Sequence, residues 1–126
     1  MPFPYSPRYH PPMPVAEIAL GAPEADFTLG ALPAIVDTGA DITLVPRDYL
    51  IRLGAPVVAG GYLRSPWGER ESVKIYEVNL RLQGHDLRHV EVASQPGGHE
   101  VLLGRNVLNL LNLQLDGPGE TLTILA

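Results

Sequence analysis

Glycine and proline divide this chain into many short apolar runs, which limits it to a fold built mainly from short strands. The 126 residues contain 13 of each, and from Val15 onward they mark turns at short intervals. The aliphatic and β-branched runs between these turns are typical of strands. They predict strands at Val15–Leu20, Phe27–Leu29, Leu32–Val36, Ile42–Val45, Val57–Arg64, Glu69–Tyr76, Val78–Leu82 and Leu87–Ala93.

Three turns predict hairpins, because each places glycine or proline between two apolar runs. They are Ser65-Pro66-Trp67-Gly68, Gln83-Gly84-His85 and Gly117-Pro118-Gly119, the last of which joins predicted strands at Leu113–Asp116 and Thr121–Leu125. Ser94–His99 is a predicted loop. A short helix is expected at Pro46–Leu53, ending at Gly54, and the clearest helix is expected at Arg105–Leu111. Many strands with one late helix predict an all-β, barrel-like domain.

Composition excludes several classes of function. The formal charge of −5 argues against a nucleic-acid partner, which favours a basic face. Without cysteine there is no disulfide framework or thiolate metal site, and no apolar run approaches the ~20 residues of a membrane span. The N-terminus lacks the apolar segment of a signal peptide, so we expect a soluble, cytoplasmic protein without a membrane partner. With one Trp and two Phe, aliphatic side chains must fill the core.

The first residues differ in composition from the rest. Residues 1–14 contain six prolines, which predict an extended segment that is neither helical nor central in a sheet. We therefore divide the chain into an N-terminal arm at 1–13 and one domain at 14–126. The arm is interpreted as a disordered or loosely docked tail, as a segment that lies on a partner subunit or near the cleft, or as an autocleaved leader.

Two motifs carry the chemical information. Residues 34–41 read Ala-Ile-Val-Asp-Thr-Gly-Ala-Asp, so an apolar strand delivers Asp37 into a tight turn. Residues 101–108 read Val-Leu-Leu-Gly-Arg-Asn-Val-Leu, about 65 residues further along. With these two motifs in this order, residues 13–126 resemble the retroviral-type aspartic proteases, the retropepsins, in their soluble single-domain form. The resemblance implies an acid-protease closed β-barrel with one short C-terminal helix, and an aspartic endopeptidase that needs no cofactor.

The Asp-Thr-Gly motif occurs once, and no internal repeat is visible. Aspartyl proteolysis uses two carboxylates that share a proton, because two like charges about 3 Å apart cannot both ionise. Each chain would therefore supply one half-site, and the resemblance implies a homodimer with Asp37 of both chains at the two-fold axis. An ordinary turn aspartate that accepts nearby backbone hydrogen bonds is the simpler interpretation of Asp37.

The resemblance assigns supporting roles to the residues around Asp37. Thr38 is expected to bond across the dimer axis, or else to cap its own turn, and Gly39 leaves room for two loops to approach. Ala40 is a candidate substrate contact, and it lacks the hydroxyl of a serine, which predicts an activity optimum less acidic than pepsin's. Asp41 is expected to form an ion pair with Arg105 and also to contact the substrate main chain. Gly104 and Arg105 are thus expected to be structural supports of the site.

The hairpin at Gly60–Ser72 occupies the position of the family's flap, which closes over an extended substrate. Trp67 and Gly68 are candidate substrate contacts at its tip, although Trp67 could instead pack into its own subunit. Retroviral flaps are glycine-rich at this point, and Pro66 and Trp67 depart from that pattern. The closing hairpin at Leu113–Leu125 is a second departure, so the terminal dimer contacts of the family are not carried over.

Other chemistries find little support in the sequence. His85 and His89 fall on a turn and a strand without a cluster of further ligands, so no metal site is expected. The serines lack a base, and Gly97-Gly98 is too short to cradle phosphate. We expect a polypeptide substrate and an apolar cleavage preference. Two alternatives stay open, a non-catalytic peptide-binding or dimerisation module of the same fold, and an enzyme that cleaves only its own leader or one dedicated partner.

Overall fold

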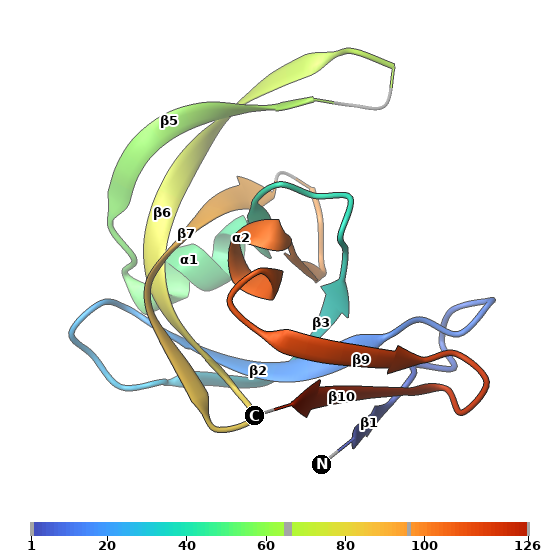
Figure 1. Ribbon diagram of the computed structural model, residues 1–126. Helices are drawn as coiled ribbons and strands as arrows, with labels where there is room; N and C mark the ends of the chain where they lie inside the picture. The colour runs from blue at the N-terminus through green and yellow to red at the C-terminus, as the bar shows by residue number, and fades with distance from the viewer. Residues whose placement is uncertain (1, 65–66, 96, 126) are drawn as a thin grey trace.

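A closed β-barrel forms the body of the molecule. The computed structural model describes residues 2–64, 67–95 and 97–125. In this part of the chain, six strands follow one another in the order β2-β3-β8-β4-β7-β6, and β2 pairs with β6 to close the ring (Figure 1). Their bounds are β2 Val15–Gly21, β3 Leu29–Val36, β4 Thr43–Pro46, β6 Arg70–Leu82, β7 His85–Gln95 and β8 Val101–Leu103. The predicted all-β closed barrel is therefore confirmed.

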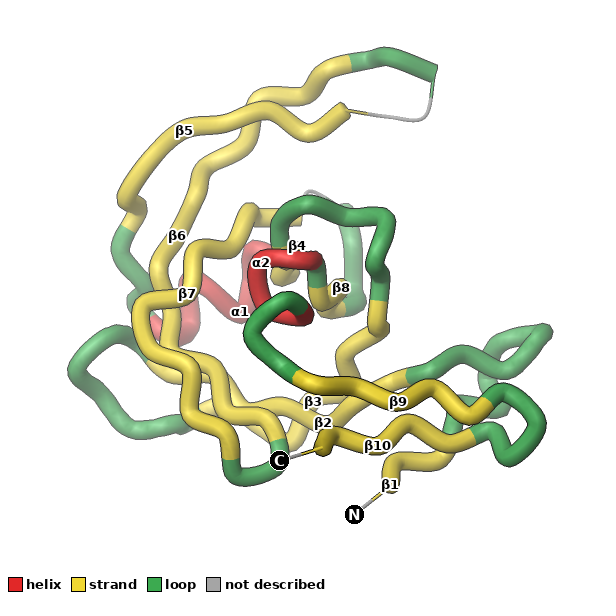
Figure 2. The backbone as a smooth tube through the Cα atoms, in the orientation of Figure 1, coloured by secondary structure: helices red, strands yellow, loops and turns green. Residues whose placement is uncertain are grey.

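A long hairpin extends from this barrel. Among the described residues, strand β5, Val57–Arg64, pairs only with β6, which continues into the barrel beyond the end of β5. Figure 2 shows the far end of this β5–β6 hairpin reaching out past the barrel, on the side where residues 37–42 lie. Ser65 and Pro66 of the predicted hairpin turn lie outside the described residues, as does Pro96 of the predicted loop at Ser94–His99.

A small second sheet joins the two ends of the chain. Strand β1, Pro2–Pro4, pairs with β10, Thr121–Leu125, which pairs in turn with β9, Asn112–Asp116. Because proline lacks a backbone N–H, an edge position such as that of β1 is the place in a sheet where it is tolerated. Residues 2–4 are thus extended and lie on β10 of the same chain, whereas residues 7–11 form turns and bends.

The core is aliphatic, as the scarcity of aromatic residues predicts. Its largest fully buried side chains are all isoleucine, leucine or valine, namely Ile18, Leu20, Leu50, Leu80, Leu82, Leu103, Leu122, Val45, Val78, Val92, Val101 and Val107. They come from the barrel strands, from both helices and from β10. Each buried side chain of this size contributes about 1.5–3 kcal/mol through the hydrophobic effect.

Two short helices complete the described structure. Helix α1, Arg47–Leu53, ends as predicted at Gly54, whose φ of 66° is the left-handed conformation that glycine adopts freely. Helix α2 spans only Arg105–Leu108, so the predicted extent to Leu111 is wrong. The N–H groups of Leu110 and Leu111 bond three residues back, to Val107 and Leu108, and form turns that lead into β9. Neither helix has the length or hydropathy that crossing a bilayer requires.

The predicted short strand at Phe27–Leu29 is wrong, because strand β3 begins only at Leu29. The Phe27 ring instead lies beneath two guanidinium groups, those of Arg81 at 4.2 Å and Arg88 at 5.2 Å from its centroid. These cation–π contacts hold the residue in a loop over β6 and β7.

Strand β6 is also continuous where two strands were predicted. The two predicted segments, Glu69–Tyr76 and Val78–Leu82, form one strand with a register shift between Val78 and Leu80. The following turn is tighter than expected, because His85 already belongs to β7 and only Gln83 and Gly84 connect the strands. Both have positive φ, as a two-residue hairpin turn requires.

An ion pair closes this β6–β7 hairpin. The Arg81 guanidinium donates two hydrogen bonds to the Asp86 carboxylate, at 2.7 and 3.0 Å. These bonds lower the pKa of the Asp86 carboxyl and raise the pKa of Arg81.

The core assignment predicts unequal effects of two leucine truncations. Leu80→Ala removes a side chain with 0% exposure and should lower the free energy of unfolding by about 2–5 kcal/mol. Leu110→Ala, at a position that is 63% exposed, should lower it by less than about 0.5 kcal/mol. Urea denaturation followed by circular dichroism measures both, and equal losses would show that Leu80 is not a core residue.

Candidate active site

The loop at residues 37–42 begins where two parallel strands end side by side. Strand β3 pairs with β8 through Ala34 to Val36, and the backbone N–H of Asp37 continues this ladder by donating to the Leu103 carbonyl at 3.1 Å. Ala34 is fully buried and Ile35 is 9% exposed, so the strand before the loop is anchored in the core. The apolar run in the sequence therefore holds Asp37 at the end of the barrel.

Asp37 organises the turn that follows it. Its carboxylate Oδ1 accepts a hydrogen bond from the Gly39 N–H at 3.0 Å, and its carbonyl accepts one from the Ala40 N–H at 3.2 Å. A side chain at residue 39 would place its Cβ 3.2 Å from Asp37 Oδ1, a close contact that glycine avoids. Asp37 is half-buried, whereas Thr38 and Gly39 are exposed. The turn thus uses one carboxylate oxygen and presents its tip to the exterior.

Gly104 and Arg105 hold the other side of the loop. The Arg105 N–H donates to the Ala40 carbonyl at 2.9 Å, and Arg105 Nη1 donates to the Thr38 carbonyl at 2.7 Å. A Cβ on Gly104 would lie 2.5 Å from the Ile42 carbonyl carbon, so only glycine lets β8 pass this close to the loop. The second sequence motif therefore supports the first through backbone hydrogen bonds.

The predicted ion pair between Asp41 and Arg105 is wrong. No such pair lies within 4 Å in the described part of the chain, and Asp41 is exposed. The Arg105 side chain turns instead toward the Thr38 carbonyl, which completes the hydrogen bonding of the loop backbone. Arg105 supports the loop, as expected, but through different atoms.

A buried polar network below the loop was not foreseen from the sequence. Thr43 has 0% exposure, and its hydroxyl donates to Asn106 Oδ1 at 2.9 Å while accepting from the Gly104 N–H at 3.0 Å. Asn106 Oδ1 also accepts from the Thr43 N–H, and Asn106 Nδ2 donates to the Glu91 carbonyl at 2.8 Å. Asn106 follows Arg105 in the second motif, which was the available signal, but nothing in the sequence indicated Thr43 as its partner.

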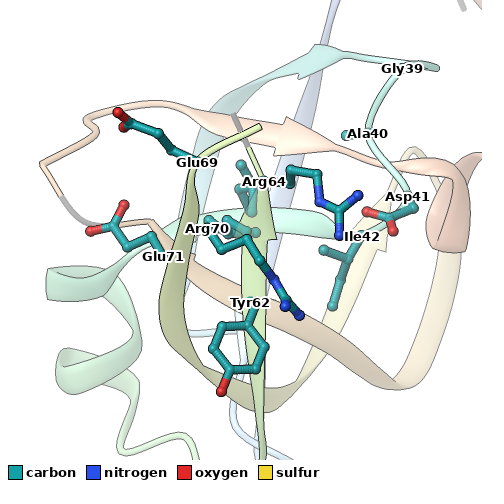
Figure 3. A pocket seen from close by; sticks show the side chains of 11 residues that line it. Gly39, Ala40, Asp41, Ile42, Tyr62, Arg64, Glu69, Arg70 and Glu71 are labelled. Atoms are coloured by element: carbon teal, nitrogen blue, oxygen red, sulfur yellow. The ribbon is translucent and has the colours of Figure 1, made fainter. Parts of the chain in front are cut away.

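A cleft of about 950 Å³ separates the loop from the β5–β6 hairpin. On the loop side it is lined by residues 39–42 and Leu44, and on the hairpin side by residues 62–64 and 69–71 (Figure 3). Ala40 and Asp41, both predicted substrate contacts, line this cleft. Trp67, which is 79% exposed, and Gly68 lie at the hairpin tip and are not part of the lining.

Across residues 2–64, 67–95 and 97–125, no three His, Asp or Glu side chains are grouped as a metal would need. His89 instead contacts the carboxylates of Glu77 and Glu24 on the surface.

The comparison with known families agrees with this geometry. The family described as "gag-polyprotein putative aspartyl protease" matches residues 30–110, which include both motifs and the cleft. The chain belongs to this family of retropepsin-like aspartyl proteases. No curated protein sequence matches the chain.

Solved structures show the same retropepsin-like fold. A retropepsin-like aspartic protease from Rickettsia conorii is 14% identical with a TM-score of 0.67, over 98% of this chain and 88% of that one. EIAV protease in complex with an inhibitor is 21% identical with a TM-score of 0.58, over 77% and 86%. The simian foamy virus protease is 23% identical with a TM-score of 0.54, over 76% and 93%. At these identities the likeness shows the fold alone.

The Thr43–Asn106 network gives a prediction about stability. Thr43→Val keeps the shape of the side chain but leaves the Gly104 N–H without its acceptor, and should lower the free energy of unfolding by about 1–3 kcal/mol. Thr123→Val is the matched control, since the Thr123 hydroxyl makes no hydrogen bond in the described residues and its loss should change little. Guanidinium denaturation measures both; equal stability of Thr43→Val and the wild type would show that the network does not stabilise the loop.

Proposed function

We propose that this chain is an aspartic endopeptidase that hydrolyses peptide bonds of an extended polypeptide as a homodimer. The observation that carries the proposal is the placement of Asp37. It lies in a turn fixed to the ends of β3 and β8, and the residues that follow it, 39–42, line the cleft of about 950 Å³. Membership in the aspartyl protease family agrees with this role.

The second carboxylate comes from a second copy of the chain. The Asp-Thr-Gly motif occurs once in the sequence, whereas the reaction needs two carboxyl groups that share one proton. Thr38 and Gly39 are exposed at the tip of the loop, which makes them available to the same loop of a partner. In the dimer the Thr38 hydroxyl bonds across the two-fold axis and Gly39 allows the close approach.

The dyad then works as an acid and a base. The ionised Asp37 takes a proton from a bound water as the water oxygen attacks the scissile carbonyl carbon, and the protonated partner carboxyl donates its proton to the carbonyl oxygen. The resulting gem-diol collapses when the carboxyl that took the proton of the water donates it to the amide nitrogen and the C–N bond breaks. The carboxylate of the partner takes a proton from one of the diol hydroxyls in the same step, which restores the singly protonated dyad. One water is consumed, and a new carboxylate and a new amine are released.

The β5–β6 hairpin acts as a flap over this reaction. A substrate held as an extended strand between the hairpin and residues 39–42 would bond to backbone groups on both sides. Closure of the hairpin excludes bulk water and aligns the peptide with the dyad. Trp67 and Gly68, at the tip, are positioned to contact the substrate or the partner's hairpin upon closure.

The first test is the replacement of the catalytic carboxylate. Asp37→Asn should abolish cleavage of a diverse peptide mixture between acidic and neutral pH, because an amide cannot act as the general base. Cleavage is measured at high protein concentration by mass spectrometry of the peptide products. Asp48→Asn, which changes an exposed aspartate at the start of α1, is the matched control and should cleave like the wild type.

Two outcomes would count against catalysis by Asp37. Cleavage that persists in Asp37→Asn would assign it to another group or to a contaminant. A wild type that forms dimers by sedimentation yet cleaves nothing would favour the non-catalytic binding module instead.

The shared site predicts a dominant effect in mixtures. When Asp37→Asn is added to an equal amount of wild type and the subunits exchange, half of the wild-type chains pair with an inactive partner. Activity per wild-type chain should therefore fall to about half, and specific activity of pure wild type should rise on concentration. Unchanged activity in the mixture, after exchange is verified by native mass spectrometry, would mean that each chain works alone.

A further inference from the structure

Two arginines face each other across the hairpin that borders the cleft. Arg64 at the end of β5 is the register partner of Arg70 at the start of β6. Like charges directly opposite one another in an antiparallel pair destabilise the hairpin. The stability of the hairpin therefore does not explain why two arginines stand opposite each other.

Neither arginine has a carboxylate partner at contact distance. Within the described residues, all ion pairs that form involve Arg81, Arg88 or His89. The Arg70 guanidinium lies over the Tyr62 ring at 4.6 Å from its centroid, which fixes its direction without neutralising its charge. The two guanidinium groups are thus charged and available, and both residues line the cleft.

The charged side chains of the hairpin point in two directions. In Figure 3 the Arg64 side chain extends toward Asp41, and Arg70 extends on the same side of the hairpin, toward Ile42. Glu69 and Glu71 extend in the opposite direction, away from the loop at residues 39–42. An extended chain that lies between the hairpin and this loop therefore passes beside the two arginines and Asp41, and away from Glu69 and Glu71.

We propose that the cleft selects polypeptides that carry an aspartate or glutamate side chain next to an apolar one near the scissile bond. The carboxylate binds Arg64 and Arg70, whose planar guanidinium groups suit bidentate hydrogen bonds. Ile42, Leu44 and Leu63 of the same lining receive the apolar neighbour. This inference rests on the proposed function, and it adds an acidic position to the apolar preference expected from the sequence.

Asp41 lies across the cleft from Arg64. It is the carboxylate toward which Arg64 extends, but the two groups form no ion pair within 4 Å. A substrate carboxylate that enters between them can accept hydrogen bonds from Arg64 without first breaking a direct contact. The desolvation cost of binding is therefore smaller than at a preformed ion pair.

The test compares matched peptides that differ in one residue. Peptides cleaved by the wild type are remade with glutamate or glutamine at every position flanking the scissile bond, and kcat/KM is measured for each pair. At one position the wild type should prefer glutamate by about tenfold or more, the value of a charge-assisted hydrogen bond. Arg64→Gln and Arg70→Gln should each reduce this ratio, whereas Arg47→Gln, an exposed arginine of α1 outside the cleft, should keep it.

Binding separates this inference from the proposed function. Glutamate and glutamine versions of an extended apolar peptide, labelled with a fluorophore, are titrated with Asp37→Asn protein and with its Arg64→Gln double variant, and anisotropy gives the dissociation constants. Tighter binding of the glutamate peptide that is lost with Arg64 supports the acidic preference even if no turnover occurs. Equal binding and equal cleavage of glutamate and glutamine peptides at every position would overturn it and leave the protease proposal intact.

Discussion

The site depends on the way in which strand β8 and helix α2 hold the loop that carries Asp37. Backbone hydrogen bonds join Asp37 to Leu103 and Arg105 to Ala40, and the Arg105 guanidinium adds a third through Thr38. Gly104 makes this approach possible, because any side chain there would overlap the Ile42 backbone. Strand β8 and helix α2 are in turn anchored in the core, since Val107 and Leu108 of α2 are buried. The loop therefore keeps its shape for as long as the barrel stays closed.

The far end of the β5–β6 hairpin is less buried than the loop at residues 37–42 that it faces. The base of the hairpin is fixed, because Val73 and Ile75 of β6 are buried against Ala93 with Ile42, Leu44 and Leu63 around them. Toward its end the residues are exposed, and Arg64 and Arg70 lie opposite each other without neutralisation. Segments with few buried contacts have the lowest local stability and are the ones that move during binding. The endopeptidase proposed above would need a loop that is fixed and a hairpin that can open and close over it.

Most of the architecture could be predicted from the sequence because it follows from local patterns. Short apolar runs between Gly and Pro indicated the strands, and the motifs around Asp37 and Gly104 indicated the family and the loop. Some errors came from contacts between distant residues and others from local turns. Phe27 lies in a loop, where its ring contacts the guanidinium groups of Arg81 and Arg88. Helix α2 is shorter than predicted because turns lead from it into β9. Thr43 and Asn106 are 63 residues apart and leave no periodic signal, so the polar network that supports the loop became visible only in three dimensions.

The central claim is that two chains share one catalytic site, and the most direct measurement is the stoichiometry of a tight inhibitor. A substrate peptide whose scissile amide is replaced by a hydroxyl-bearing tetrahedral carbon imitates the intermediate and should bind far more tightly than the substrate. Calorimetric titration counts how many such peptides the protein takes up. One inhibitor for every two chains is the predicted result, and Asp37→Asn should bind it much more weakly. One inhibitor per chain, or equal affinity for wild type and Asp37→Asn, would contradict a shared site built on Asp37.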